Sequence, residues 1–222
     1  MKIIYMLSGP EKNTRFPTKI KESLKKDLEN KKNIVFIPTS PDNFLRNDLY
    51  VYGDEKNIIG IIEYLNEISS LKNVNIIDKR LSNKESRKII KAADVLYLLG
   101  GNPFSQLEYL RKEKYDKLIK NFSGLIIGTS AGAMNLAKEA YYSKDEDFNE
   151  SIFYEALGIV NITIDPHFEI NNEEQVNEII KYSIGKKIIG LPNESGIRVA
   201  ADKVEFINKC YQFVDKELEK IN

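Results

Sequence analysis

The residues best suited to covalent chemistry lie in the segment Gly128-Thr129-Ser130-Ala131-Gly132. It has the G-x-S-x-G pattern, directly after an apolar run at 125–127 and directly before a stretch of helical period. On such a strand-to-helix turn the serine projects its Oγ from the sheet edge, and the NH groups of the helix N-terminus face developing negative charge. We therefore expect Ser130 to be a nucleophile. The alternative is a glycine-eased turn in which Ser130 only caps the helix.

A serine hydroxyl needs a positioned base, and the chain has one histidine, His167. It follows an apolar run at 160–164 in Ile164-Asp165-Pro166-His167-Phe168, so it also lies at the end of a predicted strand. We expect His167 to be the general base, the alternative being a packed or surface histidine. A single histidine also excludes a three-histidine zinc site, and we expect no metal.

The sequence does not decide which acid would orient the imidazole, because several carboxylates lie near Ser130 and His167 in sequence. They fall in the acidic loop at 145–147, on either side of His167, and in the turn at 191–196; they are Asp145, Glu146, Asp147, Asp165, Glu169 and Glu194. Spacing alone does not choose among them.

A second glycine turn, Gly100-Gly101-Asn102-Pro103, follows the apolar run at 95–99. The carboxyl ends of neighbouring parallel strands form the ligand crevice of an open sheet. A turn without side chains can present a backbone NH to an oxyanion there. The alternative is a plain turn with Asn102 as helix cap and Pro103 in the first helical position.

Short apolar runs alternate with stretches of helical period along the first 140 residues. The runs at 2–7, 34–37, 74–77, 95–99 and 125–127 predict buried strands; the stretches at 19–28, 57–69, 84–93, 104–111, 115–121 and 131–140 predict helices. This alternation predicts an α/β fold: a three-layer, doubly wound, mostly parallel sheet.

The last third is less regular. We expect a strand at 160–164, a helix at 173–182, a strand at 187–191 and a C-terminal antiparallel hairpin of 196–200 and 204–208, whose ladder 211–214 extends. No linker interrupts the chain, so we expect one domain over residues 1–222. The segment 40–53 is a candidate lid over the site.

Composition argues against several classes of protein. Lys and Arg number 33 against 33 Asp and Glu, and this balance argues against nonspecific nucleic-acid binding. The single cysteine, Cys210, excludes an internal disulfide. No run is long enough for a membrane span and the N-terminus does not have the form of a signal peptide, so we expect a cytoplasmic protein without membrane contact. No G-x-G-x-x-G follows the first strand, which disfavours a dinucleotide binder.

Taken together, the motifs resemble the dipeptidase E (α-aspartyl dipeptidase)/cyanophycinase family of serine peptidases. The resemblance covers nearly the whole chain, and its order is specific. It consists of the opening strand, Phe36-Ile37-Pro38, Gly100-Gly101-Asn102, Gly128-Thr129-Ser130-Ala131-Gly132-Ala133, Asp165-Pro166-His167-Phe168 and Gly190-Leu191-Pro192.

This resemblance implies a fold akin to class I glutamine amidotransferases and a Ser-His-Asp/Glu triad without a cofactor. Ser130 matches the family nucleophile and His167 the base. The acid aligns with Asp145, or with Glu146 if Met134 is an inserted residue. The resemblance also implies an oxyanion and substrate-binding site at Gly101, Asn102 and Ala131. The implied activity is a serine exopeptidase (dipeptidase) acting on small peptides, with N-terminal Asp-X peptides as candidate substrates. We expect a monomer or homodimer.

One departure concerns specificity. Aspartyl dipeptidases resemble one another in an arginine-bearing segment after Pro-His-Phe, whereas the stretch 171–177 here carries Glu and Asn. Two alternatives stay open. A glutamine-amidotransferase-like amidohydrolase would use Glu169 of a His-x-Glu pair, and a non-catalytic relative would bind a small molecule in the same crevice.

Overall fold

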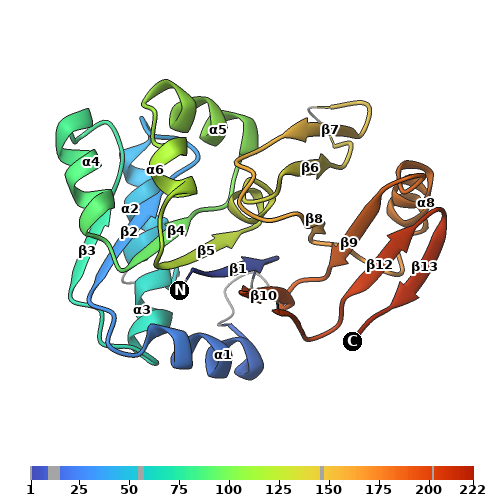
Figure 1. Ribbon diagram of the computed structural model, residues 1–222, viewed down its shortest axis with the longest axis horizontal. Coiled ribbons are helices and arrows are strands. Elements are labelled where there is room, and N and C mark those ends of the chain that lie inside the picture. The colour runs from blue at the N-terminus through green and yellow to red at the C-terminus, as the bar shows by residue number, and fades with distance from the viewer. Residues whose placement is uncertain (1, 10–15, 55–57, 146–147, 202) are drawn as a thin grey trace.

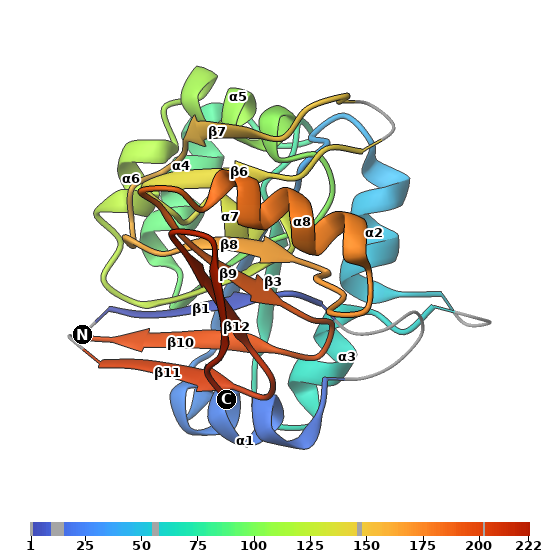
Figure 2. The ribbon, with the colours of Figure 1, turned by 90° about the vertical axis from the view of Figure 1, so that its right-hand side faces the viewer.

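A computed structural model describes residues 2–9, 16–54, 58–145, 148–201 and 203–222. Its centre is a seven-stranded sheet in the order β11-β10-β1-β5-β4-β2-β3 (Figure 1). The strands are β1 (Ile3–Leu7), β2 (Asn33–Ile37), β3 (Asn73–Ile76), β4 (Val95–Leu98), β5 (Leu125–Thr129), β10 (Gly196–Ala200) and β11 (Lys203–Ile207). From β1 to β3 the pairs are parallel, while β10 and β11 form an antiparallel hairpin on the other edge of β1, where Figure 2 shows the three strands side by side. The expected mostly parallel sheet and its hairpin are confirmed.

Helices cover both faces of this sheet. Along β4, Leu96 and Leu98 enter one apolar core and Val95 and Tyr97 the other, because successive side chains of a strand point to opposite faces. The first core packs against α4 (Asn83–Ala92), α5 (Pro103–Lys112), α6 (Asp116–Lys120) and α7 (Ala131–Met134); the second packs against α1 (Thr18–Leu28), α2 (Phe44–Tyr52) and α3 (Ile61–Asn66). Among the described helices, none is long and apolar enough to cross a membrane.

A smaller sheet, β13-β12-β9-β8, lies to one side of the large one (Figure 1). Its strands are β8 (Thr163–Pro166), β9 (Lys187–Leu191), β12 (Tyr211–Val214) and β13 (Glu217–Lys220), and α8 (Glu173–Tyr182) packs on it. The prediction that 211–214 extends the C-terminal hairpin is therefore wrong: β12 pairs with β9, and Phe213 is buried in the core of the small sheet with Phe168 and Ile188.

Three other segments differ from the sequence-based expectation. The helix expected over 131–140 ends at Met134, and β6 (Glu139–Tyr142) follows and pairs with β7 (Ile152–Glu155). The segment 40–53, expected as a lid, contains α2, whose Val51 is fully buried. The helix expected over 57–69 is shorter, and position 57 lies outside the described residues.

Candidate active site

Ser130 lies at the carboxyl end of β5, on the turn that leads into α7. Its backbone has φ 52° and ψ −119°, a conformation that a residue with a side chain rarely adopts. The Ser130 amide donates to the Leu7 carbonyl at 2.9 Å, which ties the turn to the end of β1. The turn also needs Gly132, since a Cβ there would lie 2.2 Å from the Leu98 carbonyl oxygen. The strained, tightly packed turn is the geometry of a nucleophile elbow.

His167 follows β8 and reaches the serine from the small sheet. Its Nε2 lies 2.8 Å from Ser130 Oγ. The His167 backbone has φ 58°, and its NH donates to the buried Ser8 hydroxyl at 2.8 Å. The end of β1 thus holds both members of the pair. An imidazole nitrogen at this distance can accept the proton of the hydroxyl, the first requirement for nucleophilic catalysis by serine.

The other ring nitrogen, Nδ1, lies 2.7 Å from Asn193 Oδ1. Asn193 sits in the turn between β9 and β10. That turn is held in place because the Glu194 amide donates to the Gly9 carbonyl at 2.7 Å, and Asn208 Nδ2 donates to the Glu194 carbonyl at 2.6 Å. The acceptor that the structure sets against the ring is therefore an amide oxygen.

Asp145 and Glu169, two of the acids that the sequence left open, line the same cavity as His167, which has a volume of about 890 Å³. The Asp145 carboxylate accepts hydrogen bonds from the Tyr142 hydroxyl and from the Phe148 amide. Glu146 lies outside the described residues. Asp145 and Glu169 therefore share a cavity with the ring, whereas the hydrogen-bond partner of its Nδ1 is Asn193.

Backbone amides for an oxyanion lie on either side of Ser130. Ala131 is the first residue of α7, so its NH has no partner within the helix. Gly101, with φ +132°, follows β4, and a Cβ on its neighbour Gly100 would lie 3.3 Å from Ser130 Cβ. Among the described residues, the Gly101 and Ala131 amides have no hydrogen-bond partner. Asn102 caps α5, accepting from the Ser105 amide at 3.0 Å.

The carboxyl group of Asp165 is shielded from water. Asp165, two residues before His167 and 3% exposed, accepts hydrogen bonds from the Ser143 hydroxyl and from Gln175 Nε2. Burial raises the pKa of Asp165 to about 6, and these two hydrogen bonds only partly offset that effect.

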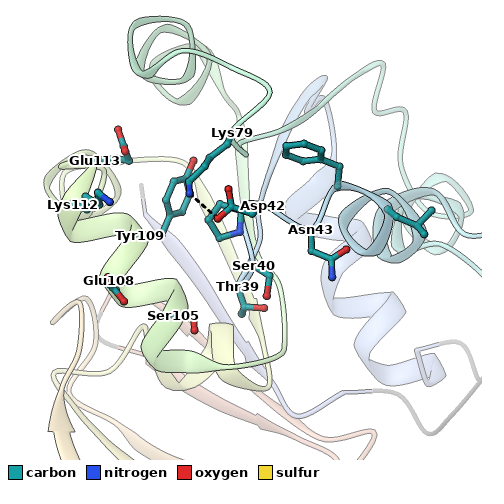
Figure 3. A pocket seen from close by; sticks show the side chains of 13 residues that line it. Thr39, Ser40, Asp42, Asn43, Lys79, Ser105, Glu108, Tyr109, Lys112 and Glu113 are labelled. Carbon is teal, nitrogen blue, oxygen red and sulfur yellow. Dashed lines mark hydrogen bonds and ion pairs between the residues drawn. The ribbon is translucent and has the colours of Figure 1, made fainter.

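A second cavity, of about 810 Å³, lies between residues 39–45 and α5 (Figure 3). Its described lining includes Thr39, Tyr109 and the ion pair of Lys79 with Asp42, but neither Ser130 nor His167. Among the described residues, no group of three or more His, Cys, Asp or Glu is placed to hold a metal ion.

Sequence reasoning missed three residues around the site. Asn193 is not among the carboxylates expected to orient the ring, although an amide oxygen also accepts a hydrogen bond. Thr39 and Arg46 contact the Gly100-Gly101 turn from the segment that was expected to be a lid. The only sequence signal for Thr39 is its place just after β2.

Comparison with known proteins places the chain among peptidases. The model of peptidase family S51 matches residues 4–207. The chain is 26% identical over 124 residues to the uncharacterized peptidase Lmo0363 of Listeria monocytogenes serovar 1/2a; the match covers 52% of this chain and 60% of that protein.

Two crystal structures share the fold. A candidate peptidase E protein from Listeria monocytogenes EGD-e superimposes with a TM-score of 0.66 at 22% identity, over 93% of this chain and 98% of that chain. A peptidase from an acI-B1 Actinobacterium gives a TM-score of 0.64 at 16% identity, over 100% of this chain and 94% of that chain.

Proposed function

We propose that this chain, which belongs to peptidase family S51, hydrolyses small peptides with Ser130 as nucleophile and His167 as general base. One observation carries the proposal: Ser130 Oγ lies 2.8 Å from His167 Nε2, on a strained turn at the carboxyl edge of the sheet. A hydroxyl and an imidazole so placed are suited to acyl transfer.

The reaction follows from these positions. Ser130 Oγ attacks the scissile carbonyl carbon while its proton moves to His167 Nε2. The Gly101 and Ala131 amides donate hydrogen bonds to the tetrahedral oxyanion. The C–N bond then breaks, and His167 returns the proton to the leaving amine. Water, deprotonated by the same imidazole, releases the acyl group and restores the serine.

Asn193 takes the orienting position in this proposal. Its Oδ1 accepts a hydrogen bond from His167 Nδ1–H, so that Nε2 is unprotonated and free to act as base. The amide fixes the ring but brings no negative charge to balance the imidazolium that forms. Asp145 and Glu169, in the adjoining cavity, are the alternative sources of that charge.

The charged side chains that line the cavity beside His167 indicate which substrate side chains it favours. Its lining contains the carboxylates of Asp145, Glu169, Glu174 and Glu178, with Lys144 paired to Glu174 at 2.6 Å. A negatively charged wall repels a substrate carboxylate. We therefore expect peptides with neutral or basic side chains at this cavity to be cleaved faster than those with acidic ones, in contrast to a strict preference for N-terminal Asp.

A dipeptide panel tests the proposal. Wild type and Ser130→Ala are assayed for free amino acids on dipeptides whose first residue is Asp, Asn, Leu or Lys. We expect wild-type turnover that Ser130→Ala reduces by roughly 10³-fold or more. Cleavage confined to Asp-X would overturn the specificity but keep the mechanism. Turnover retained in Ser130→Ala, or none by wild type on any peptide, would refute the function.

A further inference from the structure

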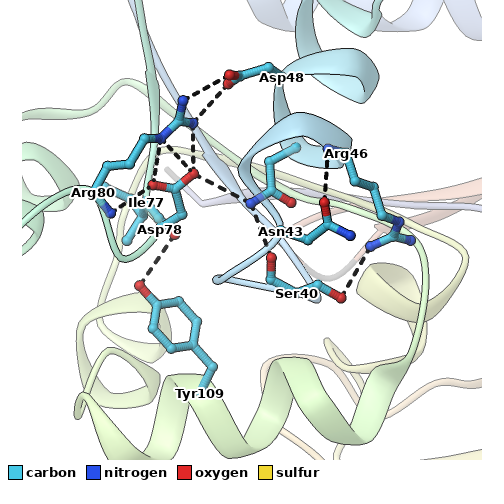
Figure 4. Close-up of polar contacts among 9 residues, drawn as sticks. Ser40, Asn43, Arg46, Asp48, Ile77, Asp78, Arg80 and Tyr109 are labelled. Carbon is cyan, nitrogen blue, oxygen red and sulfur yellow. Dashed lines mark hydrogen bonds and ion pairs between the residues drawn. The ribbon is translucent and has the colours of Figure 1, made fainter.

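The side chains of Thr39 and Arg46 donate hydrogen bonds to the Gly100-Gly101 turn. Thr39, which is fully buried, donates from Oγ1 to the Gly100 carbonyl at 3.2 Å. Arg46, on α2, donates from Nη1 to Thr39 Oγ1 at 3.0 Å and from Nη2 to the same Gly100 carbonyl at 3.4 Å. Figure 4 shows the Arg46 side chain reaching back from α2 toward Ser40.

These contacts fix the direction of the NH that the proposed mechanism uses. The Gly100–Gly101 peptide bond is trans, so its C=O and N–H point in opposite directions. The Gly100 carbonyl points toward Thr39, just after β2, and toward Arg46, on α2, so the Gly101 NH points away from them. In the sheet, β4 lies between β2 and β5. Ser130, at the end of β5, is therefore on the side of β4 opposite to β2.

The turn also packs closely against both side chains. A Cβ at Gly101 would lie 2.3 Å from Thr39 Oγ1 and 2.5 Å from Arg46 Nη2. On its other side, a Cβ at Gly100 would lie 3.3 Å from Ser130 Cβ. The turn is thus wedged between the Thr39–Arg46 pair and the nucleophile, and it has little room to rotate.

The hydrogen-bond partners of Arg46 in the described part of the chain are uncharged. Among the described residues no carboxylate lies within ion-pair distance of Arg46, whereas Arg80 pairs with Asp48 and Asp78, and Arg198 with Asp27. The Arg46 guanidinium is bound by neutral oxygens and lies 4.7 Å from the centre of the Tyr50 ring. A cation next to this peptide stabilises negative charge on its other side and strengthens the NH as a donor.

We propose that Thr39 and Arg46 are positioning residues for the oxyanion: they aim the Gly101 NH at it, and Arg46 contributes a fixed positive charge. This inference rests on the proposed function, because it assigns a role to groups that act through that oxyanion.

The test compares variants of the 222-residue chain on the dipeptide that wild type cleaves fastest. Thr39→Val keeps the shape but removes the hydroxyl, and Thr39→Ser keeps the hydroxyl. Arg46→Met removes the charge. Arg111→Met is the matched control, since Arg111 donates to the Glu155 carbonyl without touching the site. Thermal unfolding of each variant shows that it is folded.

We expect Thr39→Val and Arg46→Met each to lower kcat about 10-fold with KM nearly unchanged, on every peptide of the panel. Thr39→Ser should restore kcat, and Arg111→Met should match wild type. If Thr39→Val and Arg46→Met are folded and their kcat is unchanged, the inference is wrong. The proposed function still stands in that case, provided that wild type cleaves the dipeptide and Ser130→Ala loses this turnover. A rise in KM confined to acidic peptides would also overturn it, because Arg46 would then bind a substrate carboxylate.

Discussion

The contact between His167 and Asn193 sets the electrostatics of the proposed catalytic group. An amide oxygen at 2.7 Å from Nδ1 can hold the ring and its tautomer. It cannot stabilise the imidazolium as a carboxylate would, because it carries no net charge. Holding the His167 ring in place and balancing its positive charge are therefore two separate effects at this site. Substitutions at position 193 can change one without the other.

At position 193 we expect Asn193→Ala to lower kcat by about 10- to 100-fold, because the ring loses its orienting partner. Asn193→Asp should keep kcat at or above the wild-type value, since a carboxylate both orients the ring and balances its charge. The measurement is kcat on the fastest dipeptide of the panel. Asp145→Asn and Glu169→Gln are assayed beside them; a severe loss in either, with Asn193→Ala nearly silent, would move the orienting role to that acid.

Sequence reasoning reached Ser130 and His167 because each had strong local evidence: a motif between strand and helix for the one, and the absence of any other histidine for the other. Their contact at 2.8 Å depends on the fold, which places β8 against α7, directly after Ser130. Asn193, Thr39 and Arg46 could not be found in this way, since their roles come from contacts with residues 26, 61 and 54 positions away.

At the scale of elements, the elbow depends on α7 starting directly against β4. Gly132 makes this possible, since any Cβ there would meet the Leu98 carbonyl at 2.2 Å. The obstacle is backbone within the central sheet, which cannot move aside without disturbing the pairing of β4 with β5.

We expect Gly132→Ala to lower the free energy of unfolding by about 3 kcal/mol or more. Gly185→Ala is the matched control. A Cβ at Gly185 meets nothing within 4 Å, so only its positive φ of 66° is strained, at a cost of about 1 kcal/mol. Urea denaturation of both variants and wild type gives the comparison. Equal losses in the two variants would contradict the account of the elbow.

The end of α7 and the sheet that β12 joins were not predicted from the sequence, and each has its own physical cause. After Ser130 the side chains of Ala131, Ala133, Leu136 and Ala137 are all buried, so the segment shows no polar face that could mark where α7 ends. For β12, the alternation of residues predicts a strand correctly but not which sheet it joins. That choice follows from Phe213, which packs with Phe168 and Ile188.

At the scale of the whole molecule, Asp165 links stability to pH. Its pKa is about 6 in the folded protein against an ordinary value of 3.8, because burial disfavours the carboxylate. The folded protein therefore binds this proton more tightly than the unfolded chain. The stabilisation is complete below pH 3.8 and is lost as the pH rises through about 6.

We expect the unfolding free energy of wild type, minus that of Asp165→Asn, to fall by about 3 kcal/mol between pH 3.5 and pH 7. Taking the difference cancels the contributions of the other ionisable groups, which both proteins share. Urea denaturation at several pH values supplies the numbers. A difference that is independent of pH, or that grows as the pH rises, would show that Asp165 is not protonated preferentially in the folded state.

The central claim is that Ser130 and His167, brought together from the two sheets, act as one catalytic unit. The most direct measurement is a double-mutant cycle on dipeptide hydrolysis with Ser130→Ala, His167→Ala and the double variant. If the residues act as a unit, each single change costs roughly 10³-fold or more in kcat, and the double variant loses no more than either single one. Losses that multiply, or turnover that survives either single change, would contradict the account.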